Sequence, residues 1–138
     1  MERGVCAKLT RQSVGQTEKL MALPFAPGDY LIFQLESGYG LLRVLAVEPH
    51  DAESVWHLMA YEELFPDVET AERALADAAS LHVRAAHLPL TEHAFAKTQV
   101  ARLGNRPVRE EELTAYRAWA ARGGTVEDRS ALLLLGLR

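Results

Sequence analysis

The stretch PGDYLIFQLESGYGLLRVLAVEP, residues 27–49, constrains the fold more than any other part of the chain. Two short runs rich in aliphatic and aromatic residues flank the link ESGYG, and such runs bounded by turn formers are typical of β-strands. Glycine adopts the positive φ angles that a tight connection needs. We therefore predict a hairpin with strands at 30–35 and 41–47 and with positive φ at Gly38 and Gly40.

The rest of the sequence alternates between strand and helix patterns. Strands are predicted at 54–64 and at 81–88, where Pro89 should end the second strand. Helices are predicted at 67–79, capped by Asp67, at 91–97 after Thr91, and at 109–121 before Gly123-Gly124. The stretch RLGNRP reads as a loop, and the apolar tail at 131–137 fits either a last strand or a packed helical turn.

These elements predict an α+β domain over residues 23–138, preceded by an arm at 1–22. We expect a small curved antiparallel sheet or a partly open barrel, covered by two or three helices.

The 138 residues are 49% hydrophobic and 25% charged, which is ordinary for a globular domain. The longest apolar runs are far shorter than the roughly 20 residues of a membrane-spanning helix. A single cysteine, Cys6, fits a reducing compartment, so we expect a cytoplasmic protein with no membrane partner. Arg outnumbers Lys twelve to three, which favours a bacterial source with a GC-rich genome.

The charge is unevenly distributed along the chain. Residues 48–92 carry ten acidic and two basic side chains, whereas the last third is mildly basic. One interpretation is that these carboxylates only solvate helix faces. The other is an acidic surface that attracts a basic protein. On the second interpretation, the predicted contact residues are Glu62, Glu63, Glu69 and Glu72.

Residue patterns that would indicate catalysis are missing from the sequence. It contains no glycine-rich phosphate loop, HExxH, CxxC or GxSxG pattern. His82, His87 and His93 are not spaced to share one face for a metal, and Cys6 is remote in sequence from any histidine. We expect no catalytic residue, no metal and no cofactor, and an enzyme of unrecognised type is the least favoured interpretation.

Three aromatic residues are candidates for an interface. Trp56 and Trp119 fit core positions better than exposed ones. Tyr39, between two glycines of the hairpin link, is the better candidate for an exposed binding residue.

The hairpin resembles the opening of the immunity-protein-26 type of small bacterial antidotes. The residues that carry the resemblance are Gly28, Asp29, Gly38, Tyr39, Gly40, Arg43 and Val44. It covers about a sixth of the chain and implies a non-enzymatic cytoplasmic protein that neutralises a toxin by direct binding.

Two functions therefore remain open. The favoured one is a protein-binding module whose partner is another protein, such as a basic toxin domain. The alternative is a small-barrel nucleic-acid-binding protein, which would use basic residues of the last third together with Tyr39. The basic residues in question are Lys97, Arg102, Arg106 and Arg109.

Overall fold

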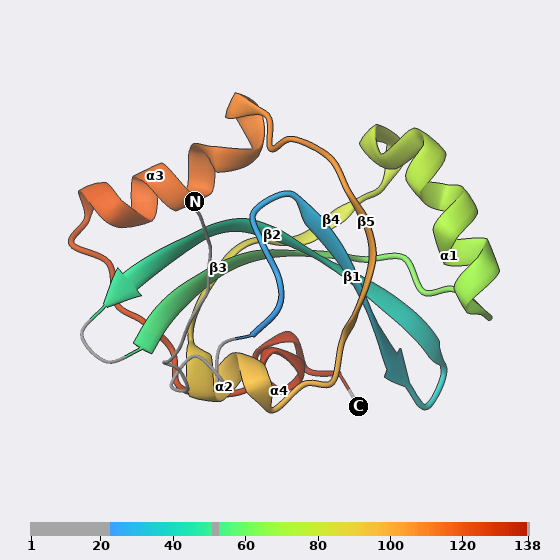
Figure 1. Cartoon of the computed structure of the whole chain (residues 1–138), viewed down its shortest axis with the longest axis horizontal. Coiled ribbons are helices and arrows are strands. Elements are labelled where there is room, and N and C mark those ends of the chain that lie inside the picture. Colours follow the sequence, from blue (N-terminus) through green and yellow to red (C-terminus); the bar gives the residue numbers. More distant parts are fainter. Residues whose placement is uncertain (1–22, 51–52, 138) are drawn as a thin grey trace, which may run out of the picture.

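The computed structural model describes residues 23–50 and 53–137, which build one antiparallel sheet with helices on both faces (Figure 1). The strand order is β4-β3-β2-β1-β5. The strands are β1 (Asp29–Leu35), β2 (Gly38–His50), β3 (Glu53–Tyr61), β4 (Val83–Thr91) and β5 (Ala101–Asn105).

The predicted hairpin is confirmed as the pair β1 and β2, with Leu35 opposite Gly38 and Tyr30 opposite Arg43. Glu36 and Ser37 alone form the turn, because β2 already begins at Gly38.

The two link glycines are needed for different reasons. Gly38 has a φ of +145°, and a Cβ there would lie 2.6 Å from the carbonyl oxygen of Phe65. The prediction of a positive φ at Gly40 is wrong, since Gly40 is not among the glycines with positive φ. Instead, a Cβ at Gly40 would lie 2.5 Å from the ring of Phe33, so the position needs a residue without a side chain.

Several boundaries differ from the prediction, and the strand predicted at 54–64 already ends at Tyr61. Strand β4 does not end at Pro89 but continues through it to Thr91. The carbonyl oxygen of Pro89 points away from β3 and accepts from the amide of Glu127. Because the N and the C=O of one strand residue point to the same side, the nitrogen of Pro89 also points away from β3. The N–H that proline lacks would therefore not have bonded to β3. The stretch RLGNRP is not only a loop, because its first residues belong to β5, which pairs with β1.

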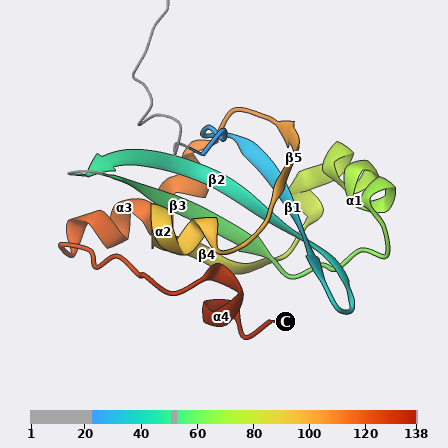
Figure 2. The same cartoon turned by 60° about the horizontal axis from the view of Figure 1, so that its bottom comes forward.

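The sheet is curved but open, so the barrel alternative is not realised. Strands β4 and β5 are its two edges and do not pair with each other. Two register shifts mark bulges: Leu103 is an extra residue of β5 opposite Tyr30 and Leu31, and Leu45 is an extra residue of β2 opposite β3. Bulges bend a strand and increase its twist, which accounts for the arched sheet in Figures 1 and 2.

Helices cover the two faces of the sheet. The face that is uppermost in Figure 1, here called the upper face, carries α1 and α3, and the lower face carries α2 and α4. The helices are α1 (Val68–Ala74), α2 (Glu92–Ala96), α3 (Thr114–Ala121) and α4 (Ala131–Leu135), with 3₁₀ helices η3 (Leu75–Ser80) and η4 (Glu110–Leu113) next to α1 and α3. The predicted helices at 67–79 and 109–121 are thus each a short α-helix joined to a 3₁₀ turn. Asp67 and Thr91 cap α1 and α2 as predicted.

The apolar tail forms the helical turn α4 rather than a strand. Ser130 caps its start and Gly136, with a φ of +71°, ends it. Ala131 and Leu135 are buried in the lower core.

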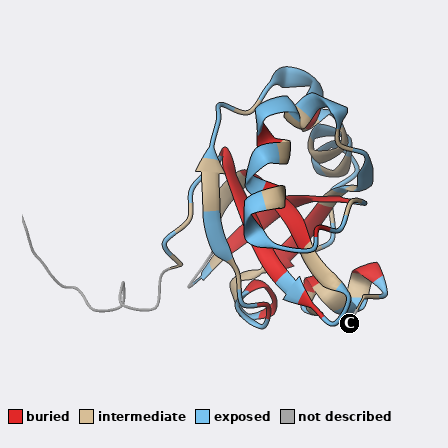
Figure 3. Ribbon diagram, turned by 90° about the vertical axis from the view of Figure 1, so that its right-hand side faces the viewer, coloured by how far each residue is buried: buried red, intermediate tan, exposed pale blue. Residues whose placement is uncertain are grey.

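Each face of the sheet has its own core, and buried residues are concentrated in the strands (Figure 3). The lower core contains Leu31, Trp56, Leu58, Leu90 and Phe95. The upper core contains Tyr30, Leu41, Met59, Tyr61 and Phe65. Because successive side chains of a strand point to opposite faces, β3 contributes Trp56 and Leu58 below and Met59 and Tyr61 above.

Candidate functional site

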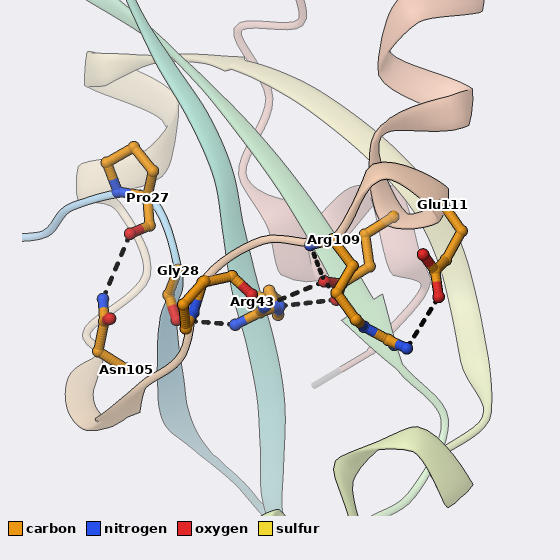
Figure 4. A network of polar contacts seen from close by, with 8 residues as sticks. Pro27, Gly28, Arg43, Asn105, Arg109 and Glu111 are labelled. Atoms are coloured by element: carbon orange, nitrogen blue, oxygen red, sulfur yellow. Dashed lines mark hydrogen bonds and ion pairs between the residues drawn. The ribbon is translucent and has the colours of Figure 1, made fainter.

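Arg43 is the largest fully buried side chain of the described residues, and it lies on the upper face in β2 (Figure 4). Its Nε and Nη2 donate to the carboxylate of Glu112 at 2.8 and 3.0 Å. Nη1 donates to the carbonyl of Gly28 and Nη2 to that of Pro107. The guanidinium also lies 4.2 Å from the ring centre of Tyr30.

The environment of Glu112 keeps this pair charged. Burial would raise the pKa of Glu112, but hydrogen bonds from Arg43 and from the amide of Arg109 outweigh it and hold the pKa below its ordinary value. With every arm of the guanidinium hydrogen-bonded, Arg43 joins β2, Gly28 and the start of η4. Its role is structural.

Asp29 has a similar structural role at the beginning of β1. Its carboxylate accepts hydrogen bonds from the amide of Ala26 and the side-chain nitrogen of Asn105, and it pairs with Arg102 at 3.0 Å. Burial would raise the pKa of Asp29, but these partners together lower it. Gly28, Asp29 and Arg43, three of the residues that carry the resemblance, therefore hold the hairpin to the C-terminal third of the chain.

A pair of histidines lies on the upper face beneath α3. His57, in β3, is completely buried; its Nδ1 lies 2.8 Å from Nε2 of His87, in β4, and its Nε2 lies 2.7 Å from Oε1 of Glu48. Tyr116 and Trp119 of α3 cover the two imidazoles.

Burial lowers the pKa of His57, an effect that Glu48 partly offsets. The pKa of His87 is lowered to about 4, chiefly by burial and in addition by the neighbouring His57 and Arg122, while Glu48 opposes these effects. Both imidazoles are therefore neutral at neutral pH. The sequence contains His57, Tyr116 and Trp119 as separate candidates, but it does not show that they lie together. Their contacts with Glu48 and His87 depend on the register of the strands.

The predicted acidic surface follows the end of β3 and helix α1. Glu62, Glu69 and Glu72 are exposed and make no ion pair within the described part of the chain. Glu63 is different, because its carboxylate accepts from the amide of His82 and lies 2.6 Å from Nδ1 of that residue. Burial would raise the pKa of Glu63, but the contacts with His82 lower it.

Two apolar side chains are exposed within the same segment. Leu64 is 43% exposed and Val68 is 41% exposed. Both lie between Glu62 and Glu69 in sequence. The segment 62–72 therefore presents carboxylates and aliphatic side chains to solvent together.

Tyr39 is less exposed than its place in the link suggests. It is half-buried against the upper core. Its amide and carbonyl exchange 2.8 Å hydrogen bonds with Phe65, which joins the hairpin to the segment before α1.

The four basic residues of the alternative function are divided between the faces and partly neutralised. Lys97 ends α2 on the lower face, whereas Arg106 and Arg109 belong to the chain that crosses to the upper face after β5 (Figure 1). Arg102 pairs with Asp29, and Arg109 pairs with Glu111.

One cavity, of about 470 Å³, brings together Ser54, His93 and Asp128, the residue types of a hydrolase triad. The contact between His93 and Asp128 is 3.4 Å long, and both side chains are about two-thirds exposed. Asp128 also accepts a hydrogen bond from Thr91. Within the described residues no hydrogen bond joins Ser54 to His93, so this arrangement does not activate a nucleophile.

Two adjoining cavities on the upper face, of about 260 and 200 Å³, share Tyr30, Ala78, Ala79 and Arg109. The groove that they form lies between η3 and the chain before η4. Tyr61 also lines it, and burial raises the pKa of that phenol far above its ordinary value. The residues that line the groove include no Ser, Thr, Cys or His.

Searches for similar proteins found no matching family model, no matching curated protein and no matching solved structure. In residues 23–50 and 53–137, no helix is both long and apolar enough to cross a membrane. Over the same residues, no three His, Cys, Asp or Glu side chains are grouped as a metal site would need. Cys6 lies outside the described residues, as does the predicted arm at 1–22.

Proposed function

We propose that this chain is a non-enzymatic, cytoplasmic protein-binding module, and that its contact surface is the segment 62–72. The observation that carries the proposal is the exposure of Glu62, Glu69 and Glu72 around the exposed Leu64 and Val68. Interfaces combine an apolar centre with a charged rim, and the rim charges accelerate encounter with a partner of opposite charge. The partner is a protein with a basic surface and an apolar contact at its centre.

The charges of this segment have little compensation nearby. Arg73 is the single basic side chain between residues 62 and 80, and it is exposed. Asp67 is used to cap α1, and Glu63 is used by His82. Glu69 lies in the first turn of α1, where it favours the helix dipole, but neither it nor Glu62 or Glu72 is used in an ion pair of the described residues, which favours a role in binding.

The resemblance to immunity-protein-26-type antidotes supports a toxin domain as the partner. It gives weaker support than the surface does, because Gly28, Asp29 and Arg43 have structural roles that many hairpins of this kind would need.

The test is the rate of association with the partner. Affinity capture from the native host, with and without nuclease, identifies the protein that binds. Its association rate is then measured for the wild type and for Glu62→Lys/Glu69→Lys/Glu72→Lys, which leaves Glu63 and its contact with His82 intact.

We expect the triple variant to associate about tenfold more slowly or worse, with a smaller change in dissociation. The wild type should associate faster at low salt, because the screening length increases from about 8 Å at physiological ionic strength to about 30 Å at 0.01 M.

A matched control separates the surface from the net charge. Glu36→Lys in the hairpin turn and Glu69→Lys in α1 change the net charge equally, and both side chains are exposed. Only Glu69→Lys should slow association. Capture that disappears with nuclease, together with tighter nucleic-acid binding by the triple variant, would support the alternative function instead.

A further inference from the structure

The contacts of α3 with the sheet are concentrated on the histidine pair. No residue of α3 is buried. Its two aromatic side chains, Tyr116 and Trp119, pack on His57 with ring centres 4.3 and 4.9 Å away, and on His87 at 5.6 and 5.3 Å. The aromatic side chains of the helix therefore rest on the two imidazoles, and Tyr116 also hydrogen-bonds to Glu48 of β2.

The chain is fixed to the sheet on both sides of this contact. Before α3, Glu112 pairs with the buried Arg43. After it, the amide of Glu127 donates to the carbonyl of Pro89 at 2.8 Å, and the amide of Thr91 donates to the carbonyl of Glu127 at 3.0 Å. We call residues 114–126, which lie between these two fixed points, the α3 segment (Figure 2).

The α3 segment is also organised internally around Trp119. The indole N–H donates to the carbonyl of Thr125 at 2.8 Å. A Cβ on Gly124 would lie 2.2 Å from the indole ring, so the ring packs directly on that backbone. The segment can therefore move as one unit.

The hydrogen bond between the two rings is incompatible with two protonated imidazoles. A carboxylate only accepts, so Nε2 of His57 donates to Glu48 and Nδ1 of His57 accepts from Nε2 of His87. If both rings were protonated, two N–H groups would face each other across 2.8 Å and the bond would be lost. Both nitrogens of His57 are already used in the closed state.

We propose that the α3 segment is an acid-released flap, closed over neutral His57 and His87 and lifted from the sheet when these histidines take up protons. Lifting the segment would bring both rings into water, where an imidazole has a pKa of about 6.5. In the closed state burial keeps the pKa of each ring below that value. The lifted state therefore binds more protons below pH 6.5, and acid favours it.

Most of the charged groups around the two histidines also oppose their protonation, and Glu48 is the exception. Arg122, at the end of α3, and the neighbouring imidazole oppose a proton on His87, as burial does. Glu48, from β2, opposes these effects by attracting a proton to either ring. Tyr116 is uncharged in this range, because burial and its hydrogen bond to Glu48 raise its pKa to about 12.

The size of the pH effect on opening can be calculated from the pKa values of His87 in the closed and open states. With a pKa of about 4 closed and about 6.5 open, His87 alone should shift the opening equilibrium by about 30-fold between pH 7.5 and pH 5. A proton taken up by His57 adds to this.

The test is amide hydrogen exchange of the full chain, corrected for the intrinsic effect of pH, at pH 7.5, 6.5, 5.5 and 5. We expect protection of the α3 segment to fall by tenfold or more between pH 7.5 and 5. Protection of β1 and β2 should fall much less. Unchanged protection of the segment, or equal loss over the whole sheet, would overturn the proposal.

Variants identify the responsible group. His87→Gln keeps a side-chain N–H for His57 but does not titrate, so it should reduce the acid effect on the α3 segment by at least tenfold. His82→Gln removes an exposed histidine elsewhere and should leave the effect as in the wild type. An acid effect that is as large in His87→Gln as in the wild type would overturn the assignment. If His87→Gln does not fold, the comparison of the segment with β1 and β2 in the wild type decides the matter.

Discussion

Single glycines fix this fold where other atoms approach the backbone too closely for a side chain. At Gly38 the chain needs a positive φ, and both Gly38 and Gly40 leave no room for a Cβ. The hairpin pattern predicts glycine at both positions, but the reason at Gly40 is the ring of Phe33, which the sequence does not reveal.

Replacing either glycine by Val should destabilise the protein by about 2 kcal/mol or more. A β-branched side chain resists positive φ at Gly38, and at Gly40 it would collide with Phe33. The measurement is the free energy of unfolding from urea denaturation.

Gly104→Ala is the matched control for these substitutions. Its Cβ would meet only Cδ1 of Leu75, at the ordinary contact distance of 3.5 Å. The change should alter stability by less than about 1 kcal/mol. Equal losses at Gly40 and Gly104 would contradict the steric explanation.

At the scale of elements, one buried ion pair connects the sheet to its upper cover. Arg43 of β2 reaches Glu112 of η4, and these residues are 69 positions apart. Arg43→Met should cost about 3–5 kcal/mol of unfolding free energy, because it leaves the carboxylate of Glu112 buried without its partner.

Two comparisons test that explanation. Arg43→Met/Glu112→Leu should be less destabilised than the sum of its single changes, since neither charge is then left alone. Arg73→Met, on the exposed side of α1, should have an effect within about 0.5 kcal/mol. Additive losses in the double variant would show that Arg43 and Glu112 stabilise the fold independently.

Most helices and strands can be predicted from the local pattern of apolar and polar residues, whereas the residues at which they begin and end are harder to predict. The strand and helix periods indicate β1 to β4, α1 and α3, and Asp67 and Thr91 mark two helix starts. Strand β5 escapes prediction because its polar, glycine-containing sequence is extended only through pairing with β1. Pro89 is tolerated inside β4 because its nitrogen faces the sheet edge.

At the scale of the whole molecule, stability should decrease in two steps on acidification. The first lies between pH 6.5 and about 4, because His57 and His87 have lowered pKa values and the unfolded chain binds protons that the folded chain does not. The second lies below about pH 4.5, where Asp29 and Glu112, whose pKa values are also lowered, are protonated first in the unfolded chain.

Urea denaturation at a series of pH values measures both steps. His87→Gln should reduce the first step and leave the second unchanged. A stability that is flat from pH 7 to pH 5 would contradict the lowered pKa values of the two histidines.

The sequence by itself determined the hairpin, the α+β class, the helix caps and the concentration of acidic residues at 48–92, because these depend on neighbours along the chain. Only the tertiary structure decided that the sheet stays open, that Arg43 meets Glu112, and that His57 meets His87, 30 positions away, beneath Tyr116 and Trp119. Such meetings depend on strand register and on the path of the chain between elements. A shift of one residue in register would turn every side chain of a strand to the other face.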